Sequence, residues 1–290
     1  MPSLKEIRAR IASVASTEKI TNAMKMVSAA KLKKSENTTL RFLPYKSKLN
    51  ETLSNYLGAL EETVNIPLAE QREPKRIALV AFSSSSGLCG VYNSSVSKLF
   101  FSTYTDFANT LGAENVEVYL FGKKLTEFAE KNGIPVTETH KSVSEELSYT
   151  LATEFSDHMA QEFLEHRIDR VVMVYNHHKN AGVQQPITEI LLPLATESAT
   201  KGEAYDYLVE PSKEEFINEL VPKVIRTMFY SVMLDAMTAE HGARMTAMLI
   251  ASDNAATLLQ ELRRDYNRAR QNVITTELID IVGGAEALNK

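Results

Sequence analysis

The residues best placed to do chemistry form a serine- and glycine-rich loop, Ser83 to Gly90, which follows a short apolar run and precedes a helical pattern. In a doubly wound α/β fold, this is where a loop would hold the phosphates of a nucleotide. The loop lacks both the G-x-x-x-x-G-K-[ST] order and the G-x-G-x-x-G order that are typical of phosphate binding. The sequence therefore favours a structural turn here, and we expect no bound cofactor.

Three other patterns could carry chemistry but lack companions. Ser28 and Lys31 match the S-x-x-K pattern of serine acylases, but no S-D-N or K-T-G follows. His177 and His178 are adjacent, so they point in different directions, and no nearby acidic cluster completes a metal site. Cys89 is the one cysteine, and a small buried thiol is the favoured interpretation over a reactive one. We expect no catalytic residue and no metal, as in a mechanical or scaffolding protein.

The composition is that of an ordinary folded protein. Of 290 residues, 44% are hydrophobic and 24% are charged, which excludes a disordered or fibrous chain and suggests one to two domains. No apolar run approaches the roughly 18 residues of a membrane-spanning helix. The first residues lack a secretory signal, an organellar presequence is disfavoured, and a single cysteine suits a reducing compartment. We expect a soluble intracellular chain that reaches a membrane only through a partner.

Charge is distributed unevenly along the chain. Residues 1–48 hold eleven basic and three acidic residues, a net of +8, which leaves −13 for the remainder of a chain whose net charge is −5. So basic an arm is suited to an acidic partner, whether nucleic acid, anionic lipid or an acidic protein surface. A solvated helix face is the alternative interpretation.

The first segment, residues 1–60, has the pattern of one long helix. Leu4, Ile7 and Ile11 begin an apolar stripe that advances by three and four residues. Pro44 is the one residue that threatens continuity, either by a kink or by the start of a second helical segment. One compact domain cannot enclose so long a helix, so it must project or pair with another helix.

Residues 75–210 show the alternation of strands and helices that is typical of a mainly parallel sheet. Apolar runs predict strands at 77–82, 116–121, 170–175 and 187–194, with a weaker one at 205–209. Helical patterns lie between the first three strands, at about 91–111, 123–132 and 144–167.

The last segment, residues 212–286, is predicted to be helical, with a kink or restart at Pro222. Its second half repeats apolar and small residues every 3.5 residues, which is typical of a left-handed coiled coil. The predicted seam consists of Met245, Met248, Ser252, Ala255, Leu259, Leu262, Tyr266, Ala269, Val273 and Thr276. Gly283 and Gly284 are predicted to end the helix. The economical arrangement is an antiparallel coiled coil of the two ends, with the α/β domain inserted at its base.

Both ends of the chain also carry long specific motifs. The N-terminal ones are K-E-I-R at 5–8, I-A-S-V at 11–14, T-E-K-I-T at 17–21 and A-M-K-M-V at 23–27. The C-terminal ones are A-R-M-T-A-M at 243–248, A-S-D-N-A at 251–255, Y-N-R-A-R-Q at 266–271, I-T-T-E-L at 274–278 and I-V-G-G-A at 281–285. In these motifs and in S-G-L-C-G at 86–90, the chain closely resembles the gamma subunits of bacterial F-type ATP synthases over its whole length.

The resemblance implies a fold and a role. The fold is an antiparallel coiled coil of long N- and C-terminal helices with an inserted Rossmann-like α/β domain. The role is that of the central rotor shaft, which couples proton flow through the membrane sector to ATP synthesis on the beta subunits and is not itself catalytic. The implied partners are a hexamer of alpha and beta subunits, the epsilon subunit and the ring of c subunits. The implied location is the cytoplasmic face of the bacterial inner membrane, without direct insertion into it. Nucleic acid is not among the implied partners.

Two groups of residues are the candidate subunit contacts. The basic cluster surrounds apolar residues of the N-terminal helix and by resemblance would meet acidic levers on beta: Met24, Lys25, Lys31, Lys33 and Lys34. The polar cluster flanks the seam of the C-terminal helix and by resemblance would meet a loop of one beta subunit: Arg268, Arg270, Gln271 and Thr275. The planar fork of arginine is suited to the carboxylates and carbonyls of such a loop.

Two departures from the family pattern limit what the resemblance implies. Ser85 and Ser86 stand where relatives commonly have Asp-Arg, so a contact made by that charged pair does not carry over. The single cysteine excludes the redox switch of plant photosynthetic relatives. Two alternatives remain at this stage: a basic-armed coiled-coil protein that binds nucleic acid, and a small enzyme on a Rossmann-like domain. The net charge of −5 weighs against the first, and the missing phosphate-loop order weighs against the second.

Overall fold

The computed structural model describes residues 3–59, 66–145, 147–195 and 212–288. Two long helices, α1 (Leu4–Ala59) and α5 (Lys213–Leu288), flank the α/β elements in the sequence. The chain divides into two compact units, and both helices contribute to each. The first unit contains Met1–Val27 and Met245–Lys290, and the second contains Ser28–Arg244. In this division, residues that contact one another belong to the same unit. The predicted domain limits, 1–60, 75–210 and 212–286, stay a prediction.

The second unit is built on a five-stranded sheet in the order β3-β2-β1-β4-β5. Its strands are β1 (Ile77–Phe82), β2 (Val116–Phe121), β3 (Glu138–His140), β4 (Arg170–Asn180) and β5 (Val183–Leu192). The first four strands pair in parallel, and β5 pairs antiparallel with β4. The predicted mixed α/β fold with long terminal helices is therefore confirmed.

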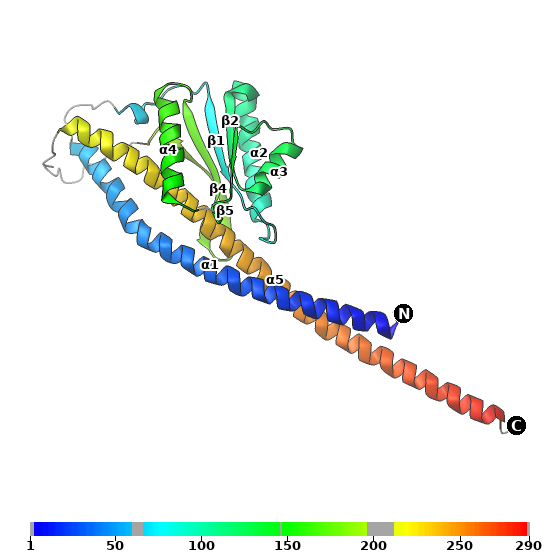
Figure 1. The fold of residues 1–290 in the computed structure, drawn as a ribbon. Helices are drawn as coiled ribbons and strands as arrows, with labels where there is room; N and C mark the ends of the chain where they lie inside the picture. The colour runs from blue at the N-terminus through cyan, green and yellow to red at the C-terminus, as the bar shows by residue number, and fades with distance from the viewer. Residues whose placement is uncertain (1–2, 60–65, 146, 196–211, 289–290) are drawn as a thin grey trace. The chain divides into compact units, whose positions relative to one another are not determined.

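Helices cover both faces of this sheet (Figure 1). One face carries α2 (Tyr92–Leu111) and α3 (Lys123–Lys131), and the other carries α4 (Tyr149–Leu164) and the first part of α5. Short 3-10 helices occupy Pro67–Ala69 and Ala113–Asn115. Because both faces are covered, every residue of β1 is buried, as in the central strand of a parallel sheet.

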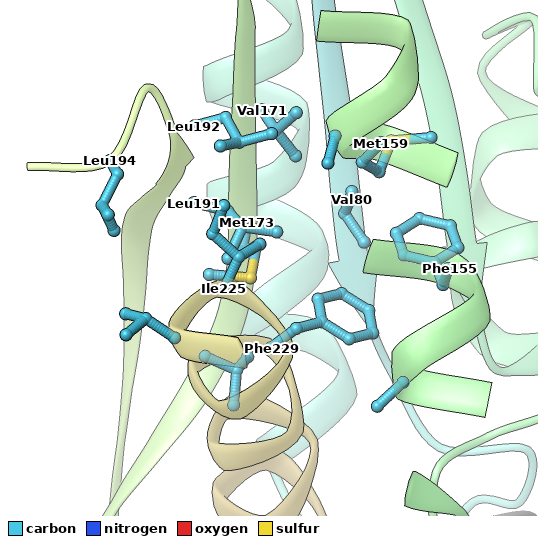
Figure 2. Packing of buried hydrophobic residues seen from close by; sticks show 14 of the residues in the cluster. Val80, Phe155, Met159, Val171, Met173, Leu191, Leu192, Leu194, Ile225 and Phe229 are labelled. Atoms are coloured by element: carbon cyan, nitrogen blue, oxygen red, sulfur yellow. The ribbon is translucent and has the colours of Figure 1, made fainter. Parts of the chain in front are cut away.

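The larger hydrophobic core lies between the sheet, α4 and α5. Phe229 of α5 stacks on Phe155 of α4 with ring centroids 4.9 Å apart, and both lie close to Val80 of β1 (Figure 2). The rings of Phe82 and Phe121 stack at 4.9 Å in the same core. The helix α5 is thus an integral layer of the α/β fold, which explains why the contact-based unit extends to Arg244.

The structure excludes one of the two alternatives at each proline and corrects the expected end of the C-terminal helix. The helix α1 continues through Pro44, and α5 runs through Pro222, so neither proline starts a new helix. Gly283 and Gly284 do not end α5, which continues to Leu288. Glycine costs a helix only about 1 kcal/mol relative to alanine, so two glycines weaken a helix without forbidding it.

The sheet differs from its prediction at β3, at β4 and at β5, which spans Val183–Leu192 in place of the predicted 187–194. The strand β3 was not predicted because its three residues, Glu138–His140, are polar and give no apolar run. The strand β4 extends to Asn180, beyond the predicted 170–175, because it continues as a hairpin with β5. The weaker strand predicted at 205–209 lies outside the described residues. Within the described residues, no helix is long and apolar enough to cross a membrane.

Candidate contact surface on the paired terminal helices

The two terminal helices pair in the first unit. The Arg8 guanidinium donates a hydrogen bond to the Tyr266 hydroxyl at 2.7 Å, and the guanidinium carbon lies 5.6 Å from the centre of the Tyr266 ring. Further along α1, the Thr21 hydroxyl lies 3.4 Å from that of Ser252. Residue numbers fall in α5 as they rise in α1, so the pair is antiparallel, as predicted.

Within the first unit, the seam of α5 is buried over its first half. The exposed fractions of five predicted seam residues lie between 4% and 8%: Met248, Ser252, Ala255, Leu259 and Leu262. The seam then opens, because Val273 is 41% exposed and Thr276 is also exposed. The 3.5-residue repeat identified the seam residues of α5. It could not show at which seam residue the cover provided by α1 ends.

Beyond the buried part of the seam, the end of α5 presents an exposed apolar surface. Every described side chain from Arg270 to Val282 is exposed. Six large apolar residues in this stretch are 41% to 66% exposed: Val273, Ile274, Leu278, Ile279, Ile281 and Val282. A soluble monomer rarely leaves so many apolar side chains together in water, so this end of α5 has the character of a contact surface.

The polar cluster lies beside this apolar end. Arg268, Arg270, Gln271 and Thr275 are all exposed, and the Thr275 hydroxyl donates to the Gln271 carbonyl at 2.9 Å. Arg268 also lines a groove of about 600 Å³ between the first turns of α1 and the last part of α5. The other lining residues are Glu6, Ile7, Arg10, Leu262, Asp265, Ala269 and Asn272. The four residues are therefore accessible to a partner, but the contact itself stays a prediction.

The basic cluster is divided between the two units. Met24 and Lys25 belong to the first unit and are half-buried, whereas Lys31, Lys33 and Lys34 belong to the second unit and are exposed. In the described part of the chain, none of the four lysines forms an ion pair. The three exposed lysines are thus accessible to a partner, and their role also stays a prediction.

The loop from Ser83 to Gly90 is filled by its own polar groups. Ser84 is fully buried, and its hydroxyl donates to the Ser86 carbonyl at 2.5 Å and accepts from the Asn93 amide nitrogen at 2.8 Å. Cys89 is buried, and the amide of Asn93 lies 3.1 Å from its sulfur. These contacts fit the structural turn that the sequence favours.

The helix α5 lies across this loop, which the sequence did not predict. The Tyr92 hydroxyl donates to the Ala236 carbonyl of α5 at 3.1 Å, and Tyr92 packs with Ala239 and Ala243. These three alanines are spaced by three and four residues, so they fall on one face of α5. That spacing of small residues was the signal in the sequence for a close approach of α5 to the loop.

A buried ion pair strengthens the same contact. Arg244 lies 2.7 Å from Glu240, and both side chains are almost buried. Arg244 also donates to the Ser86 hydroxyl at 3.1 Å, and the Ser144 hydroxyl donates to Glu240 at 2.9 Å. Burial raises the pKa of Glu240, while Arg244 and Ser144 oppose that shift. The crevice at the carboxyl ends of the strands, where such folds bind ligands, is thus occupied by the chain's own helix.

The remaining sequence candidates also have structural partners. Nδ1 of His177 lies 2.5 Å from Asp235 of α5, and the backbone N–H of His178 donates to the same carboxylate at 2.9 Å. Among the residues that the structure describes, no group of three metal-binding side chains comes together. Ser28 is buried and Lys31 is exposed, so the S-x-x-K pair is not presented together at the surface.

Comparison with known proteins matches the whole chain. The family model described as ATP synthase matches residues 3–288. The chain is 42% identical over 292 residues to the ATP synthase gamma chain of Bacteroides fragilis, covering 99% of this chain and 100% of the relative. It is 44% identical over 290 residues to that of Flavobacterium johnsoniae, covering 100% of both.

Solved structures share the fold at lower sequence identity. A chain in the structure of OSCP, F1 and c-ring from the Euglena gracilis mitochondrial ATP synthase matches this fold with a TM-score of 0.67 and 18% identity. The match covers 98% of this chain and 94% of that chain. The Tetrahymena thermophila mitochondrial ATP synthase central stalk and c-ring gives a TM-score of 0.58 and 24% identity, with 80% and 99% covered.

Proposed function

Because the chain belongs to the family of ATP synthase gamma chains and forms the rotor shaft of an F-type ATP synthase, we propose that its paired terminal helices turn inside a hexamer of alpha and beta subunits. The observation that supports this most is the exposed end of α5. Its apolar side chains from Val273 to Val282 have no covering partner among the described residues. A sleeve of surrounding subunits would cover such a helix on all sides.

The asymmetry of this surface is what would drive catalysis in the partners. The polar cluster and the basic cluster provide charge and hydrogen-bond donors at particular positions on the helices, and a turning shaft presents them to each beta subunit in succession. Contacts made only at certain angles change the free energy of one beta conformation at a time. Rotation driven by proton flow would thereby force each beta site through states of different affinity for nucleotide.

The chain itself is proposed to be non-catalytic. The crevice at which related folds hold a nucleotide is filled by α5, through Ala236, Ala239 and Ala243. Opening that crevice would expose the buried Glu240–Arg244 pair and separate it from Ser86 and Ser144. ATP chemistry is therefore assigned to the beta subunits.

The α/β domain is proposed to be the foot of the rotor, in contact with the epsilon subunit and the ring of c subunits. The structures that share this fold come from ATP synthase complexes that include a c-ring. The complex would lie at the cytoplasmic face of the bacterial inner membrane, with this chain held there through its partners.

Co-expression tests this function. The full chain carries an affinity tag and is expressed with the alpha, beta and epsilon subunits of the same organism. We expect alpha and beta to co-purify with this chain, in equal amounts to each other and with one copy of this chain per hexamer. ATP hydrolysis should appear only in the complex. Recovery of the chain alone, or ATP hydrolysis by the chain without beta, would contradict the proposal.

A further inference from the structure

Two histidines, one buried and one largely buried, lie near the joint where the β4–β5 hairpin packs on α5 in the second unit. His241 of α5 is 5% exposed, and the side chain of His178, near the end of β4, is 14% exposed. A Cβ added to Gly242 would lie 3.3 Å from Cε1 of His178, so this ring packs against α5 at the residue that follows His241. Nε2 of His178 lies 3.8 Å from Glu36 of α1. The β4–β5 hairpin, α1 and α5 therefore converge at His178, and His241 precedes the α5 residue against which this ring packs.

Each ring has one nitrogen atom without a hydrogen-bond partner in the described part of the chain. Nδ1 of His178 and Nδ1 of His241 are both buried and, among the residues that the structure describes, have no hydrogen-bond partner. A protonated imidazole has two donors that both need an acceptor, so an added proton would leave a buried donor unpaired.

The charged groups around the joint differ for the two rings. They are Lys31 and Glu36 from α1, His177 from the hairpin, and Asp235, Glu240 and Arg244 from α5. For His178, burial lowers the pKa, whereas Asp235 and Glu36 raise it. For His241, burial and the charges of Arg244 and Lys31 all act in the same direction, towards the neutral ring. The surroundings of His241 therefore oppose protonation more consistently than those of His178.

We propose that His241, with His178 beside it, makes this joint acid-sensitive, so that protonation releases α1 and the β4–β5 hairpin from α5. The inference rests on contacts within the second unit alone. Its outcome is therefore independent of whether the chain turns inside other subunits.

The size of the effect follows from linkage. Burial lowers the pKa of His241 from 6.5 to about 4, so in the closed joint the ring stays neutral at pH 5. Once the joint opens, the ring takes up a proton below about pH 6.5. Stability of the closed joint is therefore complete above pH 6.5 and is lost as the pH falls towards 4. At pH 5 the equilibrium constant for opening of the joint is therefore roughly 30-fold higher than at neutral pH. Since each tenfold change corresponds to about 1.36 kcal/mol, this is a loss of about 2 kcal/mol in the stability of the closed joint.

Hydrogen exchange on the full chain tests the proposal. Protection of backbone amides is measured at pH 7.5 and pH 5.0, after correction for the intrinsic effect of pH on exchange. In the wild type, we expect opening of α5 around His241 and of the hairpin around His178 to increase about 30-fold at pH 5.0. His241→Gln keeps a polar side chain that stays neutral, so it should remove most of this increase. His158→Gln is the matched control, because His158 is about half exposed on α4 and its loss should change nothing.

Two results would overturn the proposal: equal protection of the wild type at both pH values, or an undiminished pH effect in His241→Gln. If that variant does not fold, deuterium exchange at the histidine Cε1 of the wild type, read peptide by peptide, gives the pKa of His241 directly. A value close to 4 supports the proposal, and a value of 6 or above refutes it.

Discussion

At the scale of single residues, the α/β domain depends on close approaches that only particular side chains permit. Gly122 begins the turn after β2 with φ +101°, and an added Cβ would lie 2.2 Å from the Ser83 carbonyl oxygen. The Ser83 hydroxyl in turn accepts the backbone N–H of Leu125 at 3.0 Å. The turns after β1 and β2 are thereby locked together, and a glycine is required where they touch.

Replacement of this glycine should be costly. Gly122→Ala combines a left-handed backbone with a backbone clash, and strain of this kind costs about 1–3 kcal/mol before the clash is counted. We expect the free energy of unfolding in urea to fall by at least about 2 kcal/mol. Gly87→Ala is the control, because nothing lies within 4 Å of its added Cβ, so its change should stay within about 0.5 kcal/mol. Equal losses for the two variants would contradict this account of the turn.

Some residue roles could be predicted from sequence and others could not. The serine-rich loop was interpreted as a structural turn because its spacing lacks the phosphate-binding order, and its internal hydrogen bonds fit that interpretation. The contact of Arg244 with Ser86 joins residues far apart in the chain, so no local pattern reports it. The candidate contacts, from Met24 to Thr275, are exposed or half-buried, so this chain's own packing does not reveal their role, which stays a prediction.

At the scale of elements, apolar periodicity predicted most helices and strands. The strands β1 and β2 match their predicted limits, because buried parallel strands read as continuous apolar runs. The strand β3 was missed because three polar residues at a sheet edge carry no such signal. The ends of α5 were misjudged because a glycine pair is a weak stop signal when nothing else ends the helix.

Pairing of the terminal helices can be tested by a disulfide. Thr21 of α1 and Ser252 of α5 have hydroxyl oxygens 3.4 Å apart, which is close enough for a cysteine pair to be joined. We expect Thr21→Cys with Ser252→Cys to oxidise within one chain and to change mobility on a non-reducing gel. Thr21→Cys with the exposed neighbouring Asp253→Cys is the control and should react much less. Dimers in place of the intramolecular product would contradict the antiparallel pair.

Charge on the basic cluster should matter collectively. One exposed ion pair is worth only about 0.2–1 kcal/mol, so a single lysine-to-alanine change should do little. Reversal of Lys25, Lys31, Lys33 and Lys34 to glutamate should lower ATP-driven proton pumping severalfold in vesicles while leaving the fold intact by circular dichroism. The four corresponding changes to arginine keep the charge and serve as the control. Unchanged pumping after reversal would show that this face is merely solvated.

At the scale of the whole molecule, each unit has a distinct energetic basis. The second unit has a large core between the sheet, α4 and α5, whereas the first unit is a helix pair whose seam includes Ser252 and Ala255. A seam of small and polar residues gains less from burial than a leucine seam would. The first unit is therefore suited to share its remaining apolar surface with outside subunits.

The polar cluster offers a test of that sharing in the assembled complex. Charge-assisted hydrogen bonds contribute about 1.5–3 kcal/mol each when shielded. Replacing Arg268 and Gln271 together by leucine should lower steady-state ATP hydrolysis severalfold, because contacts made only at certain shaft angles are lost. Subunit stoichiometry is measured on the same preparation and should be unchanged. Wild-type turnover would exclude the contact, and failed assembly would assign these residues to packing.

Rotation of this chain is the most direct test of the account. Lys98 on α2 is exposed, so Lys98→Cys can carry a gold nanorod on the α/β domain while the alpha and beta subunits are fixed to a surface. With ATP present, we expect the rod to turn in one direction, at a rate that rises with ATP concentration and stops when ATP is removed. A rod that stays still while the same complexes hydrolyse ATP would contradict the conclusion that this chain is the rotor shaft.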